Sequence, residues 1–225
     1  MKLVPGRSSG TASASGRAGT NGAGGTNGPA GGAAGAGGSG AVVVAVDTAP
    51  CRHAYGPADA PILVVEYGDF ECPYCAQAAP VLRELVDTSD GQVRLVFRHF
   101  PVYDVHPYAL TAALAAEAAG AQGQFWEMHD RLFAGQDRLA DKFLRAYAGA
   151  LGVDGDLVIG DAAQPYGDAV EADYGLAIEQ GVRGTPSIFL GGTPYRGRAE
   201  IAPLRKAMAL SLRRAPSGQR RRRRG

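Results

Sequence analysis

Hydrophobic and polar positions along the chain first indicate three strands. Residues 62–67 are almost continuously apolar and are broken only by Glu66, a pattern typical of a central strand covered on both faces. Residues 93–100 alternate well enough to predict a second central strand, which Pro101 ends. The β-branched apolar run at residues 41–46 predicts a further strand at a sheet edge.

A helix is expected between the two central strands. Apolar residues recur at helical spacing over residues 72–87, which predicts a helix that turns one face to the sheet through Leu82, Leu85 and Val86. Residues 47–61 contain three prolines and are expected to form a loop. Strand, helix and strand together make a βαβ unit.

The second half of the chain switches to helical periodicity and then returns to strands. Residues 106–180 are interpreted as an inserted subdomain of four or so short helices. Residues 187–190 and 193–198, joined by Gly191-Gly192, predict a β-hairpin, and residues 201–212 predict a closing amphipathic helix. The expected class is therefore α/β.

The two ends of the chain differ in composition from the middle. Residues 1–40 hold 14 glycines and no acidic residue, which predicts a flexible tail or linker. Residues 213–225 predict a second, basic tail with five consecutive arginines at 220–224. The net charge of +1 hides an acidic domain, because residues 41–212 carry 13 basic and 22 acidic side chains. Nucleic acid is therefore not an expected partner.

No stretch of the sequence predicts a membrane span or a secretory signal. There is no run of 18 apolar residues, and residues 1–6 lack an apolar signal region. Taken literally, these features place the protein in the cytoplasm. A start codon assigned at the wrong position would instead allow an extracytoplasmic protein.

Two cysteines follow the first central strand at the spacing of a redox centre. Residues three apart on a helix lie on one face with Cβ atoms roughly 5–6 Å apart, so Cys72 and Cys75 are able to form and reopen a disulfide. Cys72 would lie at the helix N-terminus, where free N–H groups and the helix dipole favour a thiolate. Pro73 suits the first helical position, since its missing N–H has no partner there.

Three separated features together resemble the thioredoxin superfamily, and specifically its DsbA-type branch. They are Cys72-Pro73-Tyr74-Cys75 after a strand, the helical insertion, and Gly184-Thr185-Pro186 directly before a strand. Residues 55–212 are also similar to the thioredoxin-like domain attached to some bacterial sodium/proton antiporters. The resemblance implies a thioredoxin-like fold with a mixed central sheet, formed by residues 41–212.

The resemblance also implies a role for each matching residue. Cys72 corresponds to the family's nucleophile and Cys75 to its resolving cysteine. Pro186 corresponds to the cis-proline that faces the disulfide, where the preceding Thr185 pairs with a bound substrate strand. Glu66 corresponds to the family's buried acid, which implies a raised pKa and help in moving the proton of Cys75. The alternative for Glu66 is a strand-end carboxylate that reaches solvent.

The residues between the cysteines leave the direction of electron flow open. Pro73 and Tyr74, also candidates for substrate contact, form the dipeptide of glutaredoxins, whereas the strongest oxidants of the family carry a histidine there. The expected pKa of Cys72 therefore lies between roughly 3.5, as in DsbA, and roughly 7, as in thioredoxin. Oxidase, isomerase and reductase all remain possible.

The expected function is that of a thiol–disulfide oxidoreductase without a cofactor. Its partners would be protein or peptide thiols and disulfides, with a thioredoxin-like protein, a quinone-linked membrane protein or glutathione as redox partner. One rival is a glutathione-dependent reductase using Cys72 alone. The other is a non-catalytic peptide-binding module.

The remaining cysteine and histidines carry weaker signals. Zinc bound by Cys51, His53 and the two motif cysteines is disfavoured because the loop spacing does not suit a compact site. His99 and His106 flank the start of the insertion and are expected to cap a helix or lie on the surface, with a place at the active-site rim as the alternative.

Overall fold

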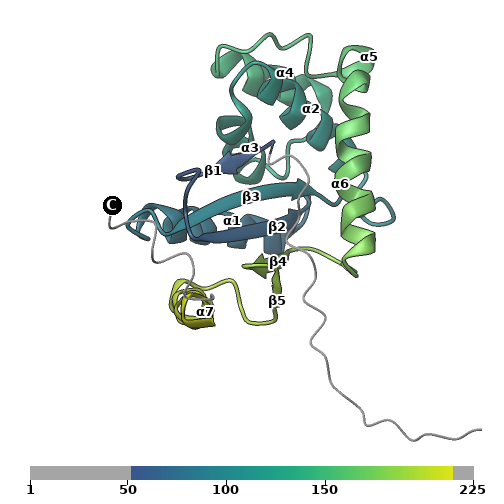
Figure 1. Ribbon diagram of the computed structural model, residues 1–225. Helices are drawn as coiled ribbons and strands as arrows, with labels where there is room; N and C mark the ends of the chain where they lie inside the picture. Colours follow the sequence, from purple (N-terminus) through teal and green to yellow (C-terminus); the bar gives the residue numbers. More distant parts are fainter. Residues whose placement is uncertain (1–51, 215–225) are drawn as a thin grey trace, which may run out of the picture. The chain divides into compact units, whose positions relative to one another are not determined.

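The computed structural model describes residues 52–214 (Figure 1). The strand expected at residues 41–46, the glycine-rich segment 1–40 and the arginine run at 220–224 lie outside the described residues.

A five-stranded mixed sheet forms the centre of the described fold. The strands are β1 (Ala54–Tyr55), β2 (Ile62–Gly68), β3 (Val93–His99), β4 (Ser187–Leu190) and β5 (Thr193–Tyr195). Their order is β1-β3-β2-β4-β5, in which β2 and β3 are parallel and the other pairs antiparallel. The two central strands, the hairpin and the α/β class expected from the sequence are confirmed. The loop expected at residues 47–61 is wrong in one place, because β1 pairs there with β3.

Helices cover both faces of this sheet. Alternate residues of a strand point to opposite faces, so Val64 packs with Leu82 of α1 (Pro73–Asp87) and Leu204 of α7 (Ile201–Arg214). The next residue, Val65, lies in a second cluster with Ala177 of α6 (Gly167–Glu179). Burial on both faces explains why β2 and β3 read as apolar runs in the sequence.

The expected helical insertion lies between β3 and β4. It consists of α2 (Ala109–Ala121), α3 (Phe125–Ala134), α4 (Asp141–Ala150), α5 (Gly160–Ala163), a 3-10 turn η1 (Gln164–Tyr166) and α6. Figure 1 shows α2 to α5 gathered beyond one side of the sheet, with the long α6 returning alongside it. One core cluster joins Cys72 and Cys75 to Met128 and Leu132 of α3 and Leu144 of α4. The insertion therefore packs directly against the cysteine pair.

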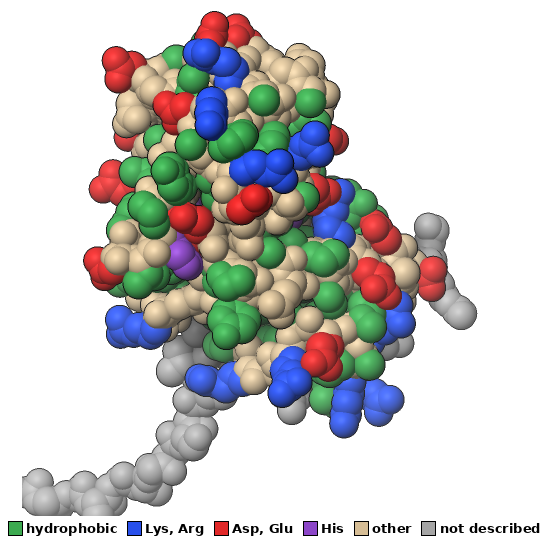
Figure 2. Space-filling model, turned by 180° about the vertical axis from the view of Figure 1, so that it is seen from behind, with side chains coloured by type: hydrophobic (Ala, Val, Ile, Leu, Met, Phe, Trp, Pro, Cys, Tyr) green, Lys and Arg blue, Asp and Glu red, His purple; other side chains and the backbone are tan. Residues whose placement is uncertain are grey.

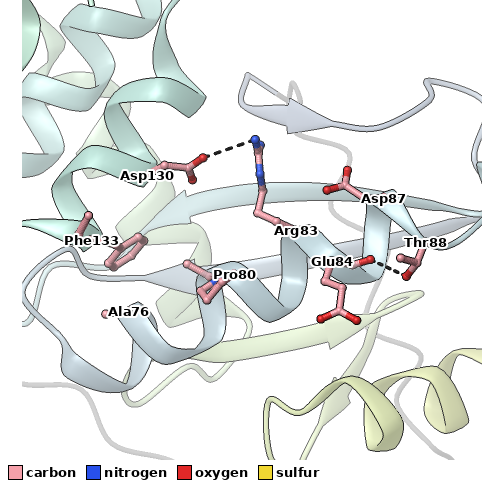
Figure 3. A pocket seen from close by; sticks show the side chains of 10 residues that line it. Ala76, Pro80, Arg83, Glu84, Asp87, Thr88, Asp130 and Phe133 are labelled. Carbon is pink, nitrogen blue, oxygen red and sulfur yellow. Dashed lines mark hydrogen bonds and ion pairs between the residues drawn. The ribbon is translucent and has the colours of Figure 1, made fainter. Parts of the chain in front are cut away.

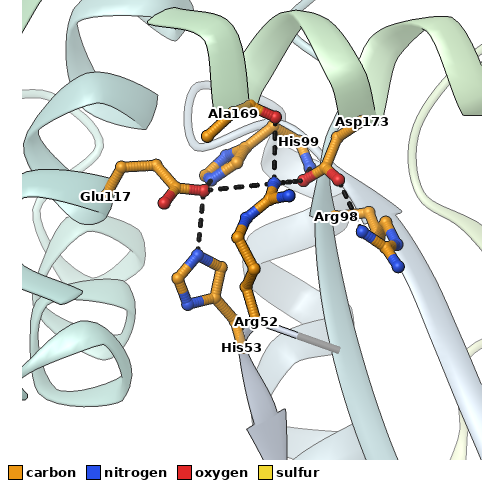
Figure 4. A network of polar contacts seen from close by, with 7 residues as sticks. All are labelled: Arg52, His53, Arg98, His99, Glu117, Ala169 and Asp173. Carbon is orange, nitrogen blue, oxygen red and sulfur yellow. Dashed lines mark hydrogen bonds and ion pairs between the residues drawn. The ribbon is translucent and has the colours of Figure 1, made fainter. Parts of the chain in front are cut away.

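A buried ionic network fastens the insertion to the sheet (Figure 4). Asp173 of α6 accepts a hydrogen bond from Arg98 of β3 at 2.7 Å and forms an ion pair with Arg52 at 2.9 Å. Glu117 of α2 contacts the imidazole nitrogens of His53 at 2.8 Å and His99 at 3.1 Å. Buried carboxylates need such partners, because an unpaired buried charge is costly.

This network corrects the expectation for His99. The residue neither caps a helix nor lies on the surface, because its side chain is 1% exposed between β3 and α2. No local pattern pointed to its partner Glu117, which is 18 residues further along the chain.

Candidate active site

The two motif cysteines lie at the start of α1, where the sequence placed them. Cys72 is the N-cap, with extended backbone angles (φ −73°, ψ 119°), and Pro73 begins the helix. The carbonyl of Cys72 accepts hydrogen bonds from the N–H groups of Cys75 and Ala76 at 3.1 and 3.2 Å. Both cysteines are free thiols in this structure. Cys75 is fully buried and Cys72 is 4% exposed, whereas Tyr74 is 67% exposed.

The second part of the motif meets the first at one end of the sheet, where β2 ends and β4 begins. The peptide bond between Thr185 and Pro186 is cis. The sulfur of Cys72 lies 3.5 Å from the carbonyl oxygen of Thr185, at a sequence separation of 113 residues. The structure therefore brings Cys72, Cys75, Thr185 and Pro186 together.

The surroundings push the pKa values of the two thiols in opposite directions. The pKa of Cys72 is lowered to about 5, chiefly by a hydrogen bond from the Cys75 thiol and further by the side chain of Thr185 and the backbone N–H groups of Cys75 and Tyr74. These bonds outweigh the opposing effect of burial. The pKa of Cys75 is raised, first by burial and then by its hydrogen bond to Cys72. At neutral pH Cys72 is therefore a thiolate and Cys75 a thiol.

Glu66 lies beneath this pair on β2. Its side chain is fully buried, and neither carboxylate oxygen has a hydrogen-bond partner among the described residues. Burial, followed by the negative charge of Cys72, raises the pKa of Glu66 to about 8. The alternative of a strand-end carboxylate that reaches solvent is wrong. Glu66 is two residues after Val64 and so points to the same face of the sheet, toward α1.

The structure adds a second carboxylate that sequence analysis missed. Asp69 is 2% exposed and accepts hydrogen bonds from the backbone N–H groups of Glu71 and Val102, both at 2.8 Å. It also contacts Nδ1 of His106 at 2.7 Å, and Glu71 accepts a hydrogen bond from the N–H of Tyr108. The segment after β3 is thus fastened to the residues just before Cys72, and His106 is a half-buried partner of Asp69 beside the motif.

Large exposed side chains are concentrated on these same two segments. Of the described residues, Tyr74, Tyr103, Val105, Tyr108 and Leu110 are among the large hydrophobic side chains that remain exposed. Figure 2 shows hydrophobic side chains gathered in the middle of the face seen from behind, with charged side chains around them. Exposed apolar surface of this kind marks interaction sites more often than chance.

A groove of about 650 Å³ runs along α1 from Ala76, the residue after Cys75 (Figure 3). Its other wall is α3, which contributes Asp130 and Phe133. Arg83 points across the groove and pairs with Asp130 at 3.5 Å. The groove also holds the carboxylates Glu84 and Asp87, so acidic side chains outnumber basic ones in its lining.

His53, which sequence analysis considered as a zinc ligand and disfavoured, has another partner in the structure. Cys51 lies outside the described residues, and His53 contacts Glu117 rather than the cysteines. His53, His99 and Glu117 offer the donor types of a metal site, with ligand atoms within 4.8 Å of one another. Both imidazoles, however, approach one carboxylate oxygen at hydrogen-bond distances, and Arg52 lies 3.5 Å from that oxygen. The cluster is accordingly interpreted as part of the ionic network.

A cysteine pair at a helix start, beside a cis-proline at the same end of a mixed sheet, defines a thioredoxin-like protein. The chain belongs to the thioredoxin family, whose family model, described as thioredoxin, matches residues 48–209. A Na⁺/H⁺ antiporter NhaA 1 of Salinispora arenicola is 46% identical over 171 residues, which cover 75% of this chain and 26% of the antiporter. The chain thus spans about a quarter of the length of the curated relatives it matches.

Solved structures confirm the fold, and some of these similar structures are DsbA-type proteins. A thioredoxin-like oxidoreductase from Silicibacter pomeroyi superposes with a TM-score of 0.64 at 27% identity, covering 74% of this chain and 95% of the other. The thiol-disulfide exchange protein alpha-DsbA2 from Wolbachia pipientis gives a TM-score of 0.62 at 21% identity and covers 71% and 86% of the two chains. Between residues 52 and 214, none of the helices has both the length and the apolar character needed to cross a bilayer.

Proposed function

We propose that this chain is a thiol–disulfide oxidoreductase that exchanges disulfides with cysteines of protein or peptide partners. The observation that carries the proposal is the position of the Cys72 sulfur, at the start of α1 and 3.5 Å from the carbonyl before the cis-proline. A thiolate in this position is the nucleophile that thiol–disulfide exchange requires.

The proposed reaction proceeds through a mixed disulfide. The Cys72 thiolate attacks one sulfur of a substrate disulfide, and the other substrate sulfur leaves as a thiolate. The Cys75 sulfur, once deprotonated, then attacks Cys72 and releases the second substrate sulfur. The substrate gains two electrons and the chain ends with a Cys72–Cys75 disulfide. The reverse sequence oxidises a substrate dithiol, so one site serves either direction.

Glu66 is proposed to accept the proton of Cys75 during resolution. While Cys72 is a thiolate, its charge helps to keep Glu66 protonated. Formation of the mixed disulfide removes that charge, which lowers the pKa of Glu66 and allows the carboxylate to act as a base. Burial of both groups keeps bulk water from substituting for this transfer.

Substrate binding is assigned to the residues around the cysteine. Thr185 and Pro186 would hold the substrate backbone, since the Thr185 carbonyl already lies beside the reacting sulfur. The exposed Pro73 and Tyr74 would contact residues that flank the substrate cysteine. The exposed aromatic residues on the neighbouring segment support a polypeptide as substrate rather than a small thiol.

The test is a Cys75→Ser variant incubated with a disulfide-containing polypeptide and, separately, with a glutathionylated peptide. The proposal expects stable mixed disulfides with the polypeptide and loss of multiple turnover. Full deglutathionylation by this variant would instead indicate the glutathione-dependent reductase. Partner binding and biological activity that survive in a Cys72→Ala, Cys75→Ala double variant would indicate the non-catalytic module.

Ion exchange by the antiporter relatives is not part of the proposal, because the chain matches only about a quarter of their length.

A further inference from the structure

A glutamine of the insertion contacts the backbone that leads into the active-site helix. Gln136 lies in the turn between α3 and α4, and its Nε2 group donates hydrogen bonds to the carbonyl of Phe70 at 2.8 Å and to the carbonyl of Cys72 at 2.9 Å. The sequence separations are 66 and 64 residues. A primary amide has two N–H donors, so the side chain can satisfy both carbonyls at once.

The turn that carries Gln136 is itself tightly held. A Cβ atom on the preceding Gly135 would overlap the hydroxyl oxygen of Tyr147 on α4, which shows how closely the turn packs there. The N–H of Arg138 also donates to the carbonyl of Gly135 at 2.8 Å. The amide of Gln136 is therefore presented from a fixed point of the insertion.

The geometry of residues 70–72 determines how the Cys72 thiolate is stabilised. Cys72 is the N-cap, and the carbonyl that accepts from Gln136 also accepts hydrogen bonds from the N–H groups of Cys75 and Ala76 at 3.1 and 3.2 Å, so backbone contacts fix its position. The backbone N–H groups of Tyr74 and Cys75 help to lower the pKa of Cys72, and their direction toward its sulfur depends on the angle at which the chain enters α1. The two hydrogen bonds from Gln136 restrict that angle, because they hold the carbonyls of Phe70 and Cys72.

We propose that Gln136 is a positioning residue through which the helical insertion sets the acidity and reduction potential of Cys72. The inference rests on the proposed function, since it assigns a role within the same site. Without the two bonds the entry to α1 gains freedom, the N–H groups point less well at the sulfur, and the thiolate loses stabilisation. A less stable thiolate makes the reduced form less favourable and the chain a weaker oxidant.

The experiment compares Gln136→Ala and Gln136→Glu with the unsubstituted chain. Gln122→Ala is the matched control, because Gln122 also bridges two parts of the insertion but contacts Ala118 and Asp154 rather than the cysteine segment. The pKa of Cys72 is read from the pH dependence of thiolate ultraviolet absorbance, and the potential from equilibration with glutathione buffers. Melting curves establish that each variant is folded.

For Gln136→Ala we expect the Cys72 pKa to rise by about one unit, a tenfold change in the thiolate equilibrium. The reduction potential should fall by about 30 mV, which is the same tenfold change for a two-electron couple. Gln136→Glu should shift both further, because a carboxylate would face two carbonyl oxygens. Gln122→Ala should leave both unchanged.

The inference is overturned if Gln136→Ala is folded and keeps the pKa and potential of the unsubstituted chain, or if Gln122→Ala shifts them equally. Should Gln136→Glu not fold, the alanine variant alone decides. An unsubstituted chain with no exchange activity would instead refute the proposed function, so the two failures are distinguishable.

Discussion

Replacing Glu66 by glutamine should change how the stability of the reduced protein depends on pH. The folded-state pKa of Glu66 is raised from 4.5 to about 8, so the folded chain keeps a proton that the unfolded chain has lost at neutral pH. A raised pKa contributes stability that is fully present below about pH 4.5 and is lost as the pH rises through 8. Glutamine fills nearly the same space and has no such proton to lose.

The size of this effect follows from the distance between the two pKa values. At pH 7, about 2.5 units above the pKa of the unfolded form, the folded chain still keeps Glu66 protonated. Keeping this proton lowers the free energy of unfolding by about 3 kcal/mol relative to low pH. Glu66→Gln should therefore raise the free energy of unfolding by up to about 3 kcal/mol at pH 7, relative to its effect at pH 4. Glu127→Gln, on the exposed side of α3, is the control for the substitution itself.

Urea denaturation of reduced protein between pH 4 and pH 8, followed by circular dichroism, measures this difference. In parallel, the lifetime of the mixed disulfide should increase by a factor of about 10² or more in Glu66→Gln, the usual contribution of a proton-transfer group. A variant whose unfolding free energy runs parallel to that of the unsubstituted chain over this pH range would refute the reasoning about Glu66.

Three further predictions follow from the described packing. Asp173→Asn removes the carboxylate that pairs with Arg98 and should cost about 3–5 kcal/mol in urea denaturation; a loss below about 1 kcal/mol would contradict it. Burial lowers the pKa of His53, so the stability that this neutral imidazole contributes should be lost as the pH falls below about 6.5; the difference in unfolding free energy between the unsubstituted chain and His53→Gln should therefore shrink from pH 7.5 to pH 5.5, and a constant difference would argue against this assignment. Gly68→Ala places a Cβ atom 2.5 Å from the ring of Phe97 on β3 and should lower the free energy of unfolding by about 1–3 kcal/mol. Gly175→Ala, in the interior of α6, meets nothing within 4 Å and should raise it by about 0.5–1 kcal/mol. Equal melting temperatures for the two variants would refute the comparison.

The parts of the site that sequence analysis predicted have local signatures. The spacing of Cys72 and Cys75 after an apolar strand predicts their place at a helix start, and the structure has them there. Glu66 could be predicted as buried because it interrupts a run whose other members are covered on both faces. In both cases the residues next to the site in the sequence are enough to predict its position or its burial.

The residues that were missed depend on contacts between distant parts of the chain. Asp69 bonds to Val102 and His106, and Gln136 bonds to residues more than 60 positions earlier. Aspartate and glutamine are common in turns and carry no periodic signal that would single out these positions. Their roles arise only when the sheet brings the segment after β3 and the α3–α4 turn to the start of α1.

The direction of electron flow depends on how this scaffold balances the two thiols. Low-pKa cysteines in redox motifs range from roughly 3.5 in DsbA to roughly 7 in thioredoxin, and Cys72, at about 5, falls between them. Its stabilisation comes from the Cys75 thiol, Thr185 and backbone N–H groups, without an imidazolium between the cysteines. Lowering the pKa of the thiol by one unit stabilises the reduced form and raises a two-electron reduction potential by about 30 mV, which makes the protein a stronger oxidant. Because Gln136 and Asp69 hold the backbone that carries these donors, we expect residues outside the motif to influence the potential as well.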